Sequence, residues 1–322
     1  MIRYVIRRIF WAVWLFFVAT FITYVIFFLI NPTPGKIVSG VNTSPVFAQK
    51  IISQLHLDVP FYQQYWIFVW NIFRNQSLGY SFQNGASVRW IIWQDAGVTA
   101  SVVIGSLFFW LLLSIPIGII SALRPRSLFD RLGMVFVLIG ISAPPLWLGL
   151  LLAYIFGFKL GWLPIADYCN LSTSAGGECS GLSHWAYHLI LPWASFTFLF
   201  AALYARMIRA TVMETSNEDF VRTARAKGAS GRRIVVHHLL RNSMLPIVTM
   251  LGMDIALALG SVIFIERVFN LHGLGVEMLD AAHTGDVPVV VGIVLFITVV
   301  VIVANFIVDV AYAYLDPRIR LR

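Results

Sequence analysis

The sequence predicts an all-α membrane protein with six transmembrane helices. Of its 322 residues, 59% are hydrophobic and only 12% are charged, about half the charged fraction usual in soluble domains. A bilayer core needs roughly 20 largely apolar residues per helix, and six uninterrupted windows reach that length. Spans this long exclude a transmembrane β-barrel, whose strands have about ten alternating residues. The windows cover approximately residues 9–30, 97–122, 132–158, 186–207, 243–265 and 288–315.

The first window is interpreted as a retained helix rather than a cleaved signal peptide. It stays apolar for about twenty residues and has no small-x-small cleavage site before Pro32. The predicted organisation is therefore an N-terminal transmembrane helix over residues 1–30, an extracytoplasmic segment over residues 31–96, and a transmembrane core over residues 97–322.

The basic residues indicate the orientation of these helices. Positively charged short loops tend to stay in the cytoplasm, and with both termini inside, Lys and Arg gather strongly on the inner side. The formal charge of +8 is thus explained by topology and does not indicate a nucleic-acid-binding surface. The basic residues left outside are Lys36, Lys50, Arg74, Arg89, Lys159 and Arg267.

Two cysteines, Cys169 and Cys179, fall in the loop between the third and fourth windows, on the oxidising side of the membrane. A disulfide closing this short loop would stabilise it by roughly 3 kcal/mol. The alternative is two unpaired thiols, since sequence does not show that the two residues come within bonding reach. Zinc is disfavoured, because no second pair of nearby ligands completes a tetrahedral site, so no metal site is predicted.

The extracytoplasmic segment is too long for a simple connector, and we expect short helices in it. Its aromatic residues could anchor it in the lipid headgroup layer, as Trp and Tyr commonly do, or could contact a substrate, and the sequence leaves both open. These aromatics are Tyr62, Tyr65, Trp66, Trp70 and Trp90.

Acidic residues at membrane depth normally face protein or water rather than lipid. Asp254 in the fifth window is therefore a possible pathway or partner contact, as Asp309 is in the sixth, although a carboxylate near the membrane edge or paired with a basic group is at least as strong an alternative for both. The small residues Gly252, Ala256 and Gly260 form one stripe that predicts a packing face. Kinks or helix ends are favoured by the prolines at positions 116, 144, 145, 192 and 246.

The longest inner loop covers residues 208–242. Ser216 and Asp219 have the spacing of a capping box, and Gly228 is placed where a left-handed residue would end a helix of about ten residues. A second helical stretch is expected from Ser230 to Pro246, joining this short helix to the fifth span. The short helix would have one charged and one apolar side, suited to a groove on another protein or to anionic lipid.

Several motifs resemble one known family. DFVRTARAKGAS followed by HHLLRNSMLP resembles the cytoplasmic coupling motif of ABC importer permeases, in the longer-spaced form of peptide and nickel systems. Further similarity covers nearly the whole chain, in YVIRRIF, LHLDVPFYQQY, SLGYSF, SAPPLWLG, ERVFNLHGLG and DVAYAYLDPRIR. Together these resemble the B-type subunit of dipeptide and oligopeptide permeases, which implies the ABC type I importer permease fold.

The resemblance implies partners and roles. The chain would pair with a homologous second permease, two ATPase domains that bind ATP and Mg, and an extracytoplasmic peptide-binding protein. The residues implied to contact the ATPase are Glu218, Asp219, Phe220, Val221, Arg222, Ala224, Arg225 and Gly228. NPTPGKIV at residues 31–38 departs from the acidic turn usual in this family. The cytoplasmic coupling motif lacks the Glu-Ala-Ala triplet of sugar permeases, which is ordinary for peptide systems.

The chain itself is not expected to be an enzyme. It has no phosphate-cradling G-x-x-x-x-G-K-[ST] motif, so ATP hydrolysis would belong to other chains. An intramembrane enzyme is disfavoured because the serines within the windows have no histidine beside them as a base. The alternatives left open are a nickel importer, suggested by His184, His188, His272 and His283, and an ion-driven secondary transporter that uses Asp254 and Asp309.

Overall fold

The computed structural model describes residues 2–26, 59–74, 77–169 and 181–315, whose regular secondary structure consists of helices and one isolated β-bridge between Tyr80 and Ser87. Five helices are long and apolar enough to cross a membrane, and a sixth span is possible if one bent pair of helices counts as a span. The six predicted spans are matched only when the bent pair counts as one span, because the described residues otherwise contain five candidates. The chain divides into two compact units, each with its own internal packing.

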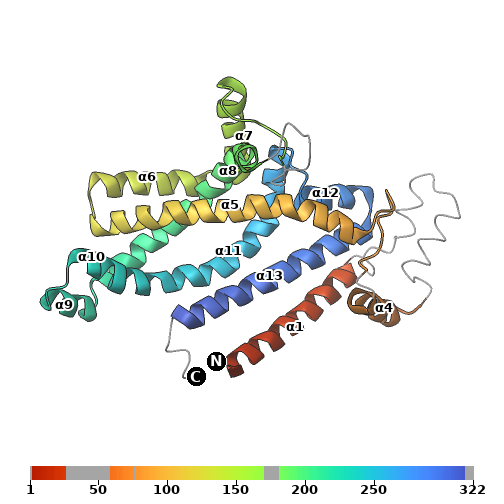
Figure 1. The fold of residues 1–322 in the computed structure, drawn as a ribbon, viewed down its shortest axis with the longest axis horizontal. Helices are drawn as coiled ribbons and strands as arrows, with labels where there is room; N and C mark the ends of the chain where they lie inside the picture. The colour runs from red at the N-terminus through yellow and green to blue at the C-terminus, as the bar shows by residue number, and fades with distance from the viewer. Residues whose placement is uncertain (1, 27–58, 75–76, 170–180, 316–322) are drawn as a thin grey trace. The chain divides into compact units, whose positions relative to one another are not determined.

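The first unit contains residues 1–97 and 272–306. Its helix α4 packs through aromatic side chains on the C-terminal half of α1 (Figure 1). Its small core joins the beginning of α5 to α12 and α13 through Val88, Leu274 and Ile293. The helices that contribute to this unit are α1 (Ile2–Tyr24), α4 (Phe61–Arg74), the start of α5 (Val88–Leu123), α12 (Leu274–Thr284) and most of α13 (Val287–Leu315).

The second unit contains the rest of α5 and is built around α8, against which α6, α7 and α11 pack. The α8 face toward this core is rich in aromatic residues, and the rings of Trp110 and Phe200 stack with centroids 4.5 Å apart. The other elements of this unit are α6 (Leu128–Ser142), α7 (Pro145–Leu152), η2 (Ala153–Lys159), α8 (Leu182–Ser216), α9 (Asp219–Ala226), α10 (Gly231–Arg233), η3 (Ile234–Leu240) and α11 (Arg241–Val268).

The third predicted span is not one straight helix. Residues Leu128–Ser142 and Pro145–Lys159 are bent by 104° at the break between them. Proline cannot continue the hydrogen bonding of a helix, so the Pro144–Pro145 pair ends one helix and starts the next. In contrast, α5, α8 and α11 continue through Pro116, Pro192 and Pro246, so of the two predicted outcomes, a kink or a helix end, the helix end does not occur there.

Two further expectations meet the structure only in part. Helix α1 begins earlier than the predicted window, while residues 27–30 of that window lie outside the described residues. In the small-residue stripe of α11, Gly252 is buried, but Gly260 is exposed and a Cβ built on it would meet nothing within 4 Å. The described residues therefore form no packing contact at Gly260.

Candidate functional site

The site predicted in the loop of residues 208–242 is a short helix connected on each side to a long one (Figure 1). Helix α8 runs to Ser216, α9 follows after a two-residue turn, and Gly231 then opens an uninterrupted helical run that reaches Val268 through α10, η3 and α11. The expected joining of the loop to the fifth span is confirmed. A displacement of α9 would be transmitted to both long helices.

The predicted capping box at the start of α9 is wrong. Ser216 is still part of α8, where its hydroxyl donates to the carbonyl oxygen of Met213 at 2.8 Å. The N-cap residue is Glu218, which makes no side-chain hydrogen bond to the helix. Serine can bond to the preceding turn of its own helix as readily as cap the next one, and here the former prevails.

The predicted end of α9 is confirmed. Gly228 has φ +77°, a left-handed conformation that glycine adopts without steric cost. Its N–H donates to the carbonyl of Arg225 at 2.9 Å, and the N–H of Ala229 donates to the carbonyl of Ala224 at 3.1 Å. These two bonds form a Schellman motif, which fixes the direction of the chain as it leaves the helix. The eight residues of α9 are two fewer than predicted.

One face of α9 is anchored to its own chain. Val221 is fully buried in a cluster with Ile234 and Leu239 of η3, and Ala224 packs against it. The predicted apolar side is therefore turned partly inward, and Phe220, 39% exposed, is its main outward apolar residue. The exposed ion pair of Arg222 is with Asp219 at 3.6 Å, and such pairs add little stability. The exposed positions of the site are Glu218, Asp219, Phe220, Arg222, Arg225 and Gly228.

A cleft of about 440 Å³ lies beside α9. Arg225 of α9 and Arg232 of α10 line it together with apolar residues of η3 and Leu123 at the end of α5. The two guanidinium groups make this cleft suited to an acidic side chain, because arginine binds carboxylates with matched geometry.

An ion pair that the sequence analysis missed fixes the helices from which this site extends. Asp130, in the first turn of α6, accepts from Nε of Arg209 at 2.6 Å and from its Nη2 at 3.0 Å, and the backbone N–H of Arg126 donates to the same carboxylate at 2.9 Å. The Asp130 side chain is only 8% exposed. This bidentate contact ties the turn between α5 and α6 to α8, two turns before α8 ends.

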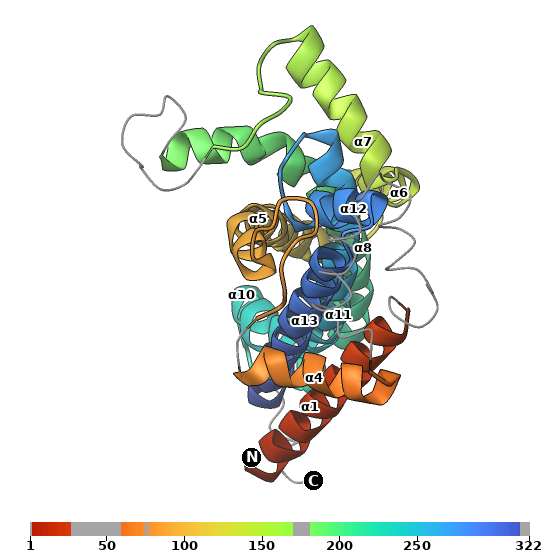
Figure 2. The same cartoon turned by 90° about the vertical axis from the view of Figure 1, so that its right-hand side faces the viewer.

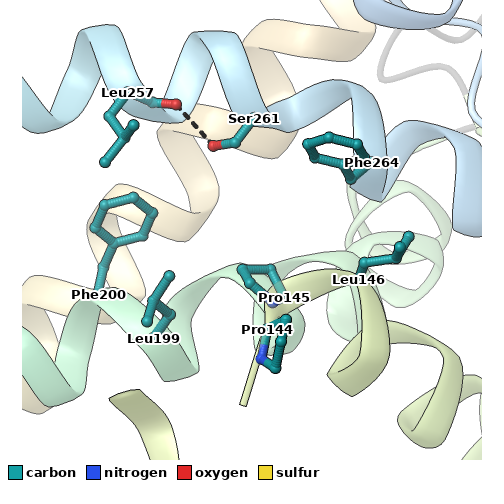
Figure 3. A pocket seen from close by; sticks show the side chains of 8 residues that line it. All are labelled: Pro144, Pro145, Leu146, Leu199, Phe200, Leu257, Ser261 and Phe264. Carbon is teal, nitrogen blue, oxygen red and sulfur yellow. Dashed lines mark hydrogen bonds between the residues drawn. The ribbon is translucent and has the colours of Figure 1, made fainter. Parts of the chain in front are cut away.

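Asp254 of α11 accepts a hydrogen bond from the hydroxyl of Tyr204 of α8 at 2.6 Å. One turn before Tyr204 in α8 and one turn after Asp254 in α11, Phe200 and Leu257 border a pocket of about 370 Å³, which Pro144 at the break of the third span also lines (Figure 3). The pocket's one polar side chain, Ser261, donates to the carbonyl of Leu257 at 2.7 Å and is thereby satisfied. Asp254 itself does not line the pocket and lies one turn from Leu257, which does.

Comparison with known proteins identifies the family. The profile described as "Binding-protein-dependent transport system inner membrane component" matches residues 114–321, and the profile of the corresponding N-terminal region matches residues 1–103. The chain belongs to this family. It is therefore a multi-pass inner-membrane permease component of an ABC importer.

Full-length relatives agree with this assignment. A protein of Brucella suis biovar 1 (strain 1330), named as a peptide permease, is 36% identical over 327 residues and covers 100% of both chains. The glutathione transport system permease protein GsiC of Escherichia coli K12 is 32% identical over 322 residues, again with 100% coverage of both. The inward-facing MetNI methionine ABC transporter matches with a TM-score of 0.53 at 18% identity, over 70% of this chain and 97% of the other, which shows a shared fold.

Two predicted features of the permease are not settled by its structure. Cys169 is buried, whereas Cys179 lies outside the described residues, so their disulfide stays a prediction. Within the described ranges no group of three His, Cys, Asp or Glu side chains is arranged to hold a metal ion.

Proposed function

We propose that this permease forms half of the translocation pathway of an ATP-driven importer of dipeptides or oligopeptides. The other half would come from a homologous permease, and an extracytoplasmic binding protein would deliver the peptide. Relatives named as a peptide permease and a glutathione permease support this cargo, because glutathione is itself a tripeptide. A nickel cargo gains no support from these relatives.

The observation that carries the proposal is the construction of α9. Val221 fixes the helix to η3 and the Gly228 turn fixes its exit, so the exposed face is presented in a defined orientation. We infer that this face contacts an ATPase subunit, which binds ATP and Mg and performs the hydrolysis. The contact residues would be Glu218, Asp219, Phe220, Arg222 and Arg225, while Val221, Ala224 and Gly228 hold the helix in place.

Coupling requires two states of the permease that the ATP-bound partner binds unequally. A push on α9 would move η3 and α11 directly, because no break in the helix separates Gly231 from Val268. It would move α8 through the short turn after Ser216, and the Asp130–Arg209 pair would carry the motion to α5 and α6. The cleft with Arg225 and Arg232 offers a place for an acidic residue of the ATPase.

The proposed topology has both termini in the cytoplasm, the segment of residues 31–96 outside, and residues 97–322 as the permease core. In this orientation the apolar pocket lies on the outer side of the Tyr204–Asp254 hydrogen bond. We propose Asp254 as a pathway residue, because opening this bond would separate α8 from α11. The loop stabilised by the Cys169–Cys179 disulfide would also lie outside.

Transport by the reconstituted complex tests the proposal. The permease, its partner permease and the ATPase subunits are reconstituted in liposomes, with labelled peptide and binding protein on the outside and ATP inside. We expect uptake that needs ATP and is abolished by Arg225→Glu, with wild-type uptake for Arg131→Glu, exposed on α6, as a charge-matched control outside α9. Uptake driven by an ion gradient without ATP would overturn the proposal in favour of a secondary transporter.

A further inference from the structure

Helix α4 carries an exposed aromatic stripe. Tyr62, Trp66, Trp70 and Phe73 follow one another at helical spacing, and their side chains are 69%, 64%, 49% and 61% exposed. Four large aromatic side chains on one side of a 14-residue helix are more than the isolated apolar residues that soluble surfaces normally expose. Such an apolar stripe indicates that this side of α4 contacts a lipid or another protein.

A second side of α4 packs on a membrane span at membrane depth. The rings of Tyr65 and Tyr24 lie 5.6 Å apart between centroids. Phe73 stands at the edge between this side and the stripe, since its ring lies 6.0 Å from that of Phe16 although its side chain is 61% exposed. Residues 16 to 24 of α1 correspond to about 12 Å along the helix axis, and all of them belong to the candidate span Ile6–Tyr24. Helix α4 therefore lies alongside the terminal part of a span, as Figure 2 shows for the two helices.

A second span gives the same depth independently. Phe68 and Ile72 of α4 pack on Val287, Val291 and Leu295 of α13. These three residues occupy the first eight steps of α13, again about 12 Å, and they open the candidate span Val287–Tyr312. Two spans thus place α4 at one rim of the bilayer, on the side where α1 ends and α13 begins.

From these contacts we propose that α4 is an interfacial helix whose Tyr62–Trp66–Trp70–Phe73 stripe is embedded in the boundary between lipid headgroups and acyl chains. Tryptophan and tyrosine concentrate at this boundary because their rings are apolar at one end and polar at the other. Amphipathic interfacial helices bury their apolar face by about 5–10 Å, which is of the same order as the roughly 12 Å at the ends of α1 and α13 that α4 contacts.

Polar residues border the stripe on one edge and fit the same occupant. The guanidinium of Arg74 lies 5.4 Å from the centre of the Trp70 ring, a cation–π contact that holds the charge beside the aromatic stripe. From there the arginine can reach lipid phosphate while its stem stays on apolar surface. Gln63 is also exposed on this edge, so the apolar stripe ends where headgroups would begin.

Spin labels on α4 of the complete complex in liposomes test the proposal. Single cysteines replace Trp66, Phe73 and, on the polar edge, Gln63, and wild type treated identically is the labelling blank. Electron paramagnetic resonance then measures collisions of each label with oxygen, which concentrates in lipid, and with a water-soluble nickel chelate. We expect oxygen to dominate at positions 66 and 73 and the chelate to dominate at position 63.

The other possible occupants give different results. Dominance of the nickel chelate at positions 66 and 73 would mean that the stripe faces water, and low collision rates with both reagents would mean that a protein partner covers it. Either result would overturn the proposal. Because two stripe positions are labelled separately, failure of one variant to assemble leaves the other to decide.

Discussion

Replacing Gly228 with alanine should loosen the turn that orients α9. The residue has φ +77°, and an L-residue in the left-handed region costs roughly 1–2 kcal/mol. A Cβ built at this position meets nothing within 4 Å, so the penalty comes from the backbone and not from a clash. The cost falls on the Schellman bonds from Gly228 and Ala229, which are the contacts that hold the end of α9.

A penalty of this size changes a conformational equilibrium by a factor of roughly 5–30. We therefore expect Gly228→Ala to reduce peptide transport per ATP hydrolysed in the reconstituted complex, while assembly of the complex is retained. Gly228→Asn should give a transport ratio between those of wild type and Gly228→Ala, because asparagine tolerates left-handed angles better than alanine.

Gly97→Ala is the matched control. It adds the same methyl group on α5, where no neighbour lies within 4 Å and φ is not in the left-handed region. It should transport peptide like wild type. Equal coupling ratios for Gly228→Ala and Gly97→Ala would refute the reasoning that the left-handed turn positions α9.

Three further predictions concern thermal unfolding of the purified complex. Asp130→Asn and Arg209→Gln should each lower the free energy of unfolding by about 1–3 kcal/mol, because each leaves a charged partner without its bidentate contact. The double variant should lose less stability than the sum of the two single losses, and simple additivity would refute the pairing. Gly118→Ala should lower the free energy of unfolding by about 1–3 kcal/mol, because its Cβ would lie 2.8 Å from the backbone oxygen of Ala205. Gly97→Ala on the same helix meets open space and should leave the stability unchanged. Equal effects of the two substitutions would contradict this prediction. Burial raises the pKa of the Glu277 carboxyl, Asp280 and Asp286 raise it further, and His272 opposes them. The folded state therefore holds this proton more tightly, and stability falls as pH rises from the ordinary glutamate pKa through the raised one. Glu277→Gln should raise the melting temperature at neutral pH and lose that advantage in acid, and a pH-independent difference would contradict the assignment.

The spans could be predicted because bilayer thickness sets their length. A window of about twenty apolar residues can be recognised without knowing its neighbours, and each predicted window corresponds to a helix or to the bent pair. The ends were less predictable. Helix α8 continues past the apolar window to Ser216, since polar residues at a helix end keep their helical conformation once the helix has formed.

The end of α9 was predictable and its beginning was not, for local physical reasons. A left-handed residue is nearly restricted to glycine, so Gly228 indicates one conformation. A serine hydroxyl can make several different local hydrogen bonds, so Ser216 does not indicate a single conformation. The inward position of Val221 depends on η3, whose packing the periodicity of α9 alone does not contain.

Long-range polar contacts were not predictable from local patterns. The Asp130–Arg209 pair joins residues 79 apart, and the Tyr204–Asp254 bond joins residues 50 apart. Asp286 is a further case, since its carboxylate accepts from the hydroxyl of Ser81 at 2.5 Å across 205 residues. The Ser127–Asp130 cap was the one local sign of these contacts, because the backbone N–H of Asp130 donates to the Ser127 hydroxyl at 3.2 Å.

The most direct test of the central claim is cross-linking from α9. A photoreactive amino acid replaces Thr223, which is exposed on α9, and, in a second variant, Asn84, which is exposed in the other unit. The complex is irradiated in native membranes and adducts are identified by mass spectrometry. We predict an adduct between position 223 and an ATP-hydrolysing subunit, and none to that subunit from position 84. Absence of the adduct at position 223 in a complex that still contains the ATPase would contradict the assignment of α9 as the coupling helix.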